Sequence, residues 1–313
     1  MIEIRGVSKA YSGRTVLHTT DLVVAGGTVV CVFGPNGSGK STLLQITAGV
    51  TPPDAGEVRI DAVDLRRSPH AARSRLGFMP QGGGLYERLT VTRHIELELS
   101  LRSRTGASAK ERVARLFDGL GLRDLVDEPA ANLSGGMRQM LALCRALCAW
   151  PAAALLDEPT AGLDGSHRDN VWRAVRELAE DGSAVLVSSH DVDDVAECDA
   201  VVCMSSGVVV AAVPVEALHQ DGLGRKKACL PRAVRRTDAV AALKCPSVLA
   251  ASFQGGCVSV WVKGSASLDA VSAELNEHGV DTAGIRHEEP TLEDRLRHVM
   301  ERGSVDPTRR DHG

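Results

Sequence analysis

The apolar positions at the start of the chain follow the period of β-strands. Extended segments are predicted over residues 1–7, 21–24 and 28–33. The last of these reads TVVCVF, a continuous apolar run typical of a strand buried on both faces of a sheet. An apolar helical stretch over 42–49 follows it. This succession of strand and helix favours an α/β fold.

The middle of the chain has helical periodicity. Residues 87–104 and 108–126 carry apolar side chains at mixed three- and four-residue spacing. After residue 190 the pattern predicts a helix over 192–197 and a hairpin of two strands over 200–213. A first domain is therefore expected over 1–218.

The remaining residues are predicted to form a small α+β domain over 237–302. Helices are expected over 237–244, 267–278 and 291–302, and strands over 247–253, 257–263 and 280–287. A basic segment, 219–236, precedes this domain. We expect it to be a solvated linker, with contact to anionic lipid headgroups as the alternative. A polar, disordered tail is expected over 303–313. The basic residues of the segment are Arg225, Lys226, Lys227, Arg232, Arg235 and Arg236.

The composition of the chain excludes several classes of protein. Hydrophobic residues make up 43% and charged residues 24%, which excludes wholesale disorder. A net charge of −4 and an aromatic content of 3% argue against binding to nucleic acid. The most apolar stretch, 200–215, is too interrupted to span a membrane, and the first residues do not resemble a secretory signal. We therefore expect a cytosolic chain.

The eight cysteines fit a reducing compartment. They form no CxxC pair, so buried, reduced thiols are the favoured interpretation. Cys144 and Cys148, four residues apart on a predicted helix, leave a metal site open as the alternative.

A glycine-rich segment links the apolar strand 28–33 to the helical stretch after it. Its pattern, G-x-x-x-x-G-K-S between strand and helix, is that of a phosphate-binding loop. Glycines allow successive N–H groups to turn toward an anion, and the following helix adds its positive end. Lys40 would contact the β- and γ-phosphates, and the Ser41 hydroxyl would bind Mg²⁺. The segment comprises Gly34, Pro35, Asn36, Gly37, Ser38, Gly39, Lys40, Ser41 and Thr42.

A pair of carboxylates ends a second apolar strand. The sequence AAALLDEPT places Asp157 and Glu158 after the run, and Pro159 stops the strand. Asp157 is interpreted as a Mg²⁺ partner. Glu158 is interpreted as the base that positions or deprotonates the attacking water, a role worth about 10²- to 10⁴-fold in rate.

Between these motifs stands LSGGMRQ, residues 133–139. In this order the motifs resemble one family, the nucleotide-binding subunits of ATP-binding cassette (ABC) transporters. The resemblance implies a P-loop ATPase cassette with a mixed sheet and a helical subdomain inserted at about 82–150. It also implies that Ser134, Gly135 and Gly136 cover the γ-phosphate of ATP bound to the opposite subunit of a dimer.

The resemblance assigns roles to four further residues. Tyr11 would stack on adenine, and Gln81 would reach Mg²⁺ and the attacking water. Asp164 would link the two active sites across the dimer. His190, after an apolar strand, would contact the γ-phosphate.

The sequence also departs from the family pattern. Met137 and Gly165 replace a frequent Gln and Pro, and Arg93-His94 replaces a frequent Glu-Asn in the region expected to face a membrane partner. The segment EPTLED, 289–294, resembles the end of many type-2 exporter ATPases, including exporters of drugs, antibiotics and polysaccharides.

Together these features predict an ATP- and Mg²⁺-dependent motor of an ABC exporter. Its expected partners are a second copy or a sister ATPase, and a transmembrane permease at the cytoplasmic face of the cell membrane. The C-terminal unit is expected to modulate or stabilise dimerisation. The alternatives are an importer ATPase, which would carry the same catalytic motifs, and a soluble cassette ATPase acting on ribosomes or DNA. Three features disfavour the soluble ATPase: the chain has a single cassette, the segment between Gln81 and Ser134 is short, and the net charge is −4. A non-enzymatic binding module is disfavoured because both Glu158 and His190 are present.

Overall fold

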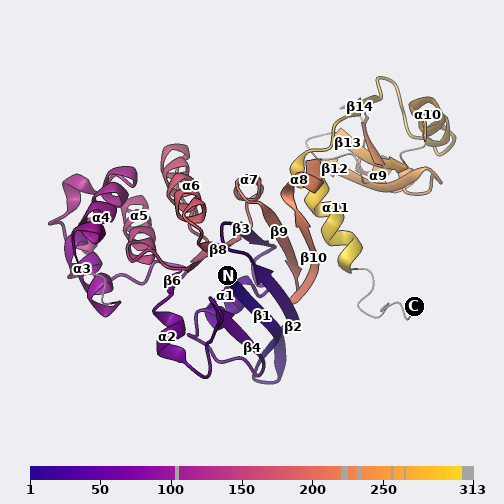
Figure 1. Cartoon of the computed structure of the whole chain (residues 1–313). Helices are drawn as coiled ribbons and strands as arrows, with labels where there is room; N and C mark the ends of the chain where they lie inside the picture. Colours follow the sequence, from indigo (N-terminus) through magenta and orange to yellow (C-terminus); the bar gives the residue numbers. More distant parts are fainter. Residues whose placement is uncertain (103–105, 220–224, 231–234, 255–256, 264–265, 305–313) are drawn as a thin grey trace. The chain divides into compact units, whose positions relative to one another are not determined.

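The apolar runs become the strands of a central sheet in the structure, a computed structural model (Figure 1). It describes residues 1–102, 106–219, 225–230, 235–254, 257–263 and 266–304. The chain divides into two compact units. The first comprises residues 1–215 together with 299–304, and the second comprises 216–298.

Six strands form the main sheet of the first unit, in the order β10-β9-β3-β8-β7-β6. The pairs from β6 to β9 are parallel, and β10 closes the edge antiparallel to β9. Every residue of β7 and β8 is buried, as their unbroken apolar sequences require. The strands are β3 (Val29–Phe33), β6 (Leu76–Met79), β7 (Ala153–Asp157), β8 (Ala184–Ser189), β9 (Ala200–Ser205) and β10 (Val208–Pro214).

A second, antiparallel sheet of the first unit has the order β2-β1-β4-β5. Its first two strands are longer than the pattern predicts. They form one hairpin whose turn, Ser12-Gly13, has positive φ at both residues, and this geometry suits the twist of paired strands. The strands are β1 (Ile2–Tyr11), β2 (Arg14–Val24), β4 (Ala55–Ile60) and β5 (Val63–Asp64).

The helices of the first unit include α1, which shares a continuous core with strands of both sheets. Leu43, Leu44 and Ile46 of α1 are fully buried in that core. Figure 1 shows α3, α4 and α5 grouped beside the six-stranded sheet. The helices are α1 (Lys40–Thr47), α2 (Pro69–Arg73), α3 (Val91–Leu101), α4 (Ala107–Gly119), α5 (Gly135–Leu147), α6 (Gly165–Glu180) and α7 (Val192–Ala196), with 3₁₀ turns at Arg123–Leu125 and Ala130–Asn132.

The second unit has a four-stranded antiparallel sheet in the order β12-β13-β11-β14. Val258, Val260 and Val262 alternate along β13 and enter a small core with Val271 and Leu275 of α10. The strands are β11 (Arg225–Cys229), β12 (Val248–Gln254), β13 (Cys257–Lys263) and β14 (Arg286–Glu288). The helices are α8 (Val215–His219), α9 (Arg236–Ala242), α10 (Leu268–Glu277) and α11 (Leu292–Ser304), of which α8 and α11 also extend beyond this unit.

The prediction of a solvated linker over 219–236 is wrong for its middle part. Strand β11 lies there, inside the sheet, with Ala228 and Cys229 buried. Lys227 is also buried, and its charge is compensated there: its Nζ atom lies 2.7 Å from Asp294 and 3.8 Å from Glu288. A lysine with two carboxylate partners can occupy a strand that its charge alone would disfavour. Arg232 lies outside the described residues.

Two further expectations about the second unit change. The strand predicted over 280–287 is reduced to β14, since hydrogen bonds from Val280 to Leu275 and from Ile285 to Thr282 form turns instead. The final helix extends to Ser304, and the rest of the predicted tail lies outside the described residues.

The thiols of Cys144 and Cys148 are free and buried, as the core interpretation predicts. Burial raises the pKa of both, that of Cys148 to about 12, so these side chains behave as small apolar groups.

Candidate ATP site

The phosphate loop connects β3 to α1 and is held tightly against neighbouring backbone. Gly39 precedes the first helical residue with φ 101°, a conformation that favours glycine. A Cβ atom at Gly39 would lie 2.9 Å from the Val16 carbonyl oxygen, and one at Gly34 would lie 2.2 Å from that of Met204. Both positions therefore require glycine, because a carbonyl oxygen of a neighbouring segment lies too close for a side chain, and Gly39 requires it also because of its φ.

Lys40, the first residue of α1, folds back over the loop. Its Nζ atom donates to the carbonyl oxygens of Gly34 at 2.8 Å and Pro35 at 3.2 Å. Burial lowers the pKa of Lys40, and the carboxylates of Glu158 and Asp157 oppose this effect. An anion in the loop would also oppose it, because it would add a negative charge beside the ammonium group.

Asp157, at the end of β7, lies against the hydroxyl of Ser41. The Ser41 Oγ atom donates to its Oδ1 atom at 3.1 Å, and Ser188 Oγ donates to the same atom at 2.5 Å. Asp157 Oδ2 is buried and has no hydrogen-bond partner among the described residues. A hydroxyl oxygen and an unsatisfied carboxylate oxygen are ligands that Mg²⁺ prefers, so this pair fits the ion.

Glu158 is the next residue and has φ 51°, in the left-handed region. Such a backbone costs about 1 kcal/mol or more in a residue other than glycine, and residues of this kind cluster in turns and at active sites. The backbone N–H of Glu158 donates to the hydroxyl of Ser188 at 3.0 Å. This bond holds the strained residue at the end of the strand.

The Glu158 carboxylate contacts two other predicted site residues. Gln81 Nε2 lies 3.5 Å from Oε2, and His190 Nδ1 lies 3.4 Å from Oε1. The Glu158 side chain is mostly buried, whereas that of His190 is half exposed. Gln81 follows β6 and His190 follows β8, so the three side chains meet where neighbouring parallel strands end, the edge at which α/β sheets bind ligands.

A cavity of about 200 Å³ lies over the phosphate loop. It brings Lys40 and Ser41 together with Gln81 and Glu158, which lie far from them in the sequence. The full lining comprises Val16, Asn36, Gly37, Gly39, Lys40, Ser41, Thr42, Gln81 and Glu158.

The residues of the LSGG segment do not line this cavity. Ser134 caps α5 by accepting from the Met137 N–H at 3.3 Å, and Gly135 and Gly136 form the first turn. A Cβ atom at Gly136 would lie 3.6 Å from the Leu163 side chain. The segment therefore presents a capped helix N-terminus away from the phosphate loop of its own chain.

The cavity lining also omits Gly34, Pro35, Ser38, Asp157 and His190, which belong to the phosphate loop or contact Ser41 or Glu158. Two further predicted residues, Tyr11 and Asp164, lie outside the lining as well. Tyr11 ends β1, is 45% exposed and has the Lys9 ammonium 5.4 Å from its ring centroid. Asp164 caps α6. Hydrogen bonds from His167 and Ser166 lower the pKa of Asp164 to about 2. The structure of one chain does not bring either residue to Lys40.

The motifs did not indicate two side chains that hold the catalytic strand end. Ser188 bonds both Asp157 and Glu158, as described above. Gln139, on α5, donates through Nε2 to the carbonyl oxygens of Glu158 at 2.9 Å and Pro159 at 3.0 Å. Gln139 thus joins the LSGG helix to β7 within one chain. Gln139 is the last residue of LSGGMRQ, but the motif assigns it no role. Ser188 does not stand out, since a serine in a strand usually bonds to solvent or to its neighbours in sequence.

Comparison with known proteins gives consistent matches. The ABC transporter family model matches residues 17–161. The probable multidrug ABC transporter ATP-binding protein YbhF of Escherichia coli is 33% identical over 94% of this chain and 51% of its own length. The chain thus spans about half the length of that relative. The Nod factor export ATP-binding protein I of Azorhizobium caulinodans is 35% identical over 69% of this chain and 68% of its own length.

Solved structures agree with these sequence matches. An ATP-binding subunit of an ABC transporter superposes with a TM-score of 0.67 and 28% identity, covering 71% of this chain and 94% of its own. The dimeric bacterial ABC transporter cassette MJ0796 superposes with a TM-score of 0.63 and 29% identity. The match covers 68% of this chain and 98% of that cassette. No described helix of the present chain is both long and apolar enough to cross a membrane. The chain belongs to the family of ABC transporter ATP-binding proteins, and its first unit has the fold of their cassette.

Proposed function

We propose that the chain binds ATP with Mg²⁺ and hydrolyses it to drive a membrane exporter. The observation that carries this proposal is the contact of Glu158 with Gln81 and His190, beside the unsatisfied oxygen of Asp157. A base, a water-orienting amide and an imidazole meet there within reach of a phosphate loop.

Different residues of the chain bind the phosphates, hold the metal and act on the attacking water. The loop N–H groups and Lys40 bind the phosphates, and Ser41 and Asp157 hold the metal. Mg²⁺, when bound, neutralises charge that develops on the phosphate oxygens. Glu158 accepts a proton from the attacking water, which Gln81 orients, and His190 donates a hydrogen bond to the γ-phosphate.

A complete site in this proposal requires two cassettes. The LSGG residues lie away from the cavity of their own chain and offer a helix N-terminus to an anion. The dimeric state of the MJ0796 cassette supports a pair of cassettes, and we propose that the two chains meet head to tail. We propose that ATP closes the pair and that hydrolysis reopens it. In the closed pair, Tyr11 stacks on adenine and Asp164 lies between the two sites.

The relatives support a proposal of coupling to a membrane permease. Their names describe export of Nod factor and lipopolysaccharide and resistance to daunorubicin and doxorubicin. We propose that this chain acts at the cytoplasmic face of the membrane, and that the Gln81 loop and the inserted helices transmit closure to the permease.

The test is co-purification of a tagged Glu158→Gln chain, with ATP, from detergent-solubilised native membranes. A stoichiometric polytopic membrane protein is the expected result. Recovery only with ribosomes, with DNA or without a partner would contradict the transporter assignment.

A further inference from the structure

Asp194, in α7, is a buried carboxylate that the reaction described above does not use. It is 1% exposed. Its Oδ2 atom accepts from Thr160 Oγ1 at 2.7 Å and from Ser189 Oγ at 2.6 Å. Its Oδ1 atom accepts from Arg168 Nη2 at 2.9 Å and from Trp172 Nε1 at 3.2 Å. A carboxylate is costly to remove from water, and here one cation and three neutral donors offset that cost.

Two of these donors lie on either side of Asp164 in the chain. Thr160 stands four residues before Asp164, in the segment that follows β7, and Arg168 stands four residues after it, near the start of α6. Asp194 is therefore bonded at both ends of the segment that carries Asp164.

The same network holds both neighbours of His190 in the chain. Ser189, the last residue of β8, directly precedes His190 and donates to Asp194. Asp191 directly follows His190. Its backbone N–H donates to Ser189 Oγ at 2.9 Å, and its carboxylate accepts from Arg168 Nη1 at 2.7 Å. The position of the imidazole thus depends on groups that are bonded to Asp194.

This network borders the proposed reaction site. The hydroxyls of Thr160 and Ser189 bond the same oxygen atom of Asp194, so a displacement of either segment moves the partner of the other. A cavity of about 150 Å³ beside the network is shared with two side chains of the ATP site. Its lining includes Glu158, Thr160, Arg168, His190 and Asp194.

We propose that Asp194 is a positioning residue through which the segment around Asp164 sets the placement of His190. The inference rests on the proposed function, in which Asp164 lies between the two sites of the closed pair. Contact at Asp164 then fixes its segment, and the Asp194 carboxylate carries this constraint through Ser189 to His190. Coupling between separated groups runs through contiguous hydrogen-bond networks of this kind.

The experiment measures kcat and the KM for ATP of the full chain as wild type, as Thr160→Val, as Ser189→Ala and as the double variant. Each single substitution removes one hydroxyl that bonds Asp194 and leaves the ion pair of Asp194 with Arg168 in place. We expect kcat to fall about 10-fold or more in each, with KM changed less than about twofold, because the loss affects the reacting geometry rather than ATP binding.

The double variant separates a connected network from two unrelated packing defects. If Asp194 joins the two segments, either substitution already interrupts the connection. The double variant should then be no slower than the slower single variant, within about twofold.

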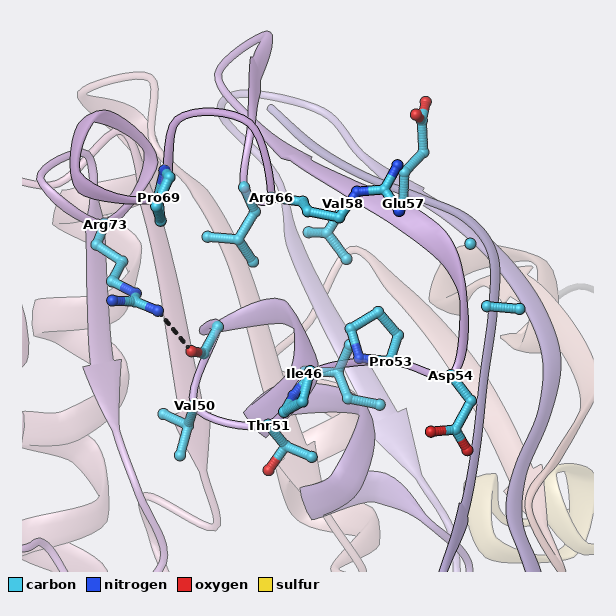
Figure 2. Close-up of a pocket in the computed structure, with 15 residues that line it drawn as sticks. Ile46, Val50, Thr51, Pro53, Asp54, Glu57, Val58, Arg66, Pro69 and Arg73 are labelled. Atoms are coloured by element: carbon cyan, nitrogen blue, oxygen red, sulfur yellow. Dashed lines mark hydrogen bonds between the residues drawn. The ribbon is translucent and has the colours of Figure 1, made fainter.

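Two controls accompany these variants. Thr160→Ser keeps the hydroxyl and should keep wild-type turnover. Thr47→Val makes the same change as Thr160→Val at a fully buried residue whose hydroxyl donates within α1, to the Leu43 carbonyl at 2.7 Å. Thr47 follows Ile46, which lines a separate cavity away from the phosphate loop (Figure 2), so turnover should not change.

Losses that multiply in the double variant would overturn the inference, because independent defects behave in that way. Unchanged kcat in both single variants, a loss confined to KM, or an equal loss in Thr47→Val would overturn it as well. All of these results leave ATP hydrolysis by the wild-type chain intact. Absence of hydrolysis by the wild type would instead contradict the proposed function, and this inference with it.

Discussion

Glu158 adopts an unfavourable backbone conformation and keeps it because neighbouring side chains hold it. Ser188 accepts from its N–H, and Gln139 donates to its carbonyl oxygen. The same serine hydroxyl bonds the Asp157 carboxylate, so one side chain of the adjacent strand holds that carboxylate and the Glu158 backbone. Such supporting contacts fix the direction of a catalytic group without touching the substrate.

Ser188→Ala should therefore lower ATP turnover about 10-fold or more, a loss typical of a positioning residue. The measurement is steady-state hydrolysis, with ATP affinity followed separately. Ser183→Ala is the control, because Ser183 is also buried and loses a hydrogen bond to Pro151, but it lies at the opposite end of β8. Equal turnover in the two variants would show that Ser188 does not position the carboxylates.

For single residues, the sequence predicts roles within a motif of neighbouring residues better than it predicts contacts between residues far apart in the chain. The loop around Lys40 and the pair Asp157-Glu158 could be proposed from sequence because the chemistry needs neighbouring residues in a set order. The roles of Ser188 and Gln139 could not, since they arise from the register of β7 against β8 and from the packing of α5.

Among the elements, β11 and α11 show how a charged motif can be structural. The EPTLED segment contains Thr291 and Asp294, which exchange hydrogen bonds at the start of α11, and Asp294 also accepts from the buried Lys227 of β11. Burial alone would raise the pKa of Asp294. Hydrogen bonds from Lys227 and Thr291 outweigh it and hold that pKa below its ordinary value.

Asp294→Asn should destabilise the second unit by about 1–3 kcal/mol at neutral pH, because it leaves the buried Lys227 with one carboxylate partner fewer. A carboxyl whose pKa is lower in the folded state stabilises the fold above its unfolded pKa. That contribution disappears as pH falls through the folded value. Denaturant unfolding should thus show a gap between wild type and variant at pH 7 that narrows in acid below pH 4. A gap of constant size would exclude ionised Asp294 as its source.

The same elements limit sequence-based prediction. The six basic residues of 219–236 favour a linker in the sequence, because the carboxylate partners of Lys227 come from a distant strand and helix. Strand β13 has the predicted bounds, because its alternating valines form a strand pattern that does not depend on partners elsewhere in the chain.

At the scale of the whole molecule, the two units have separate cores. The site side chains all belong to the first unit, and no residue that the structure describes in the second unit lines the cavity over the phosphate loop. Its contribution is therefore expected to be to assembly rather than to chemistry.

Truncation after residue 218 should weaken ATP-dependent dimerisation. The measurement is the mass of Glu158→Gln, with and without the truncation, by light scattering in ATP. Circular dichroism of the truncated chain controls for folding of the first unit. Dimerisation that is unchanged by the truncation would remove the proposed role of the second unit.

The central claim is that Glu158 is the base for ATP hydrolysis in a cassette that closes as a dimer. The most direct test compares Glu158→Gln with wild type for ATP binding, turnover and oligomeric mass. The account predicts retained ATP affinity, turnover reduced about 10²-fold or more, and a stable dimer in ATP. Near-normal turnover in the variant would contradict it.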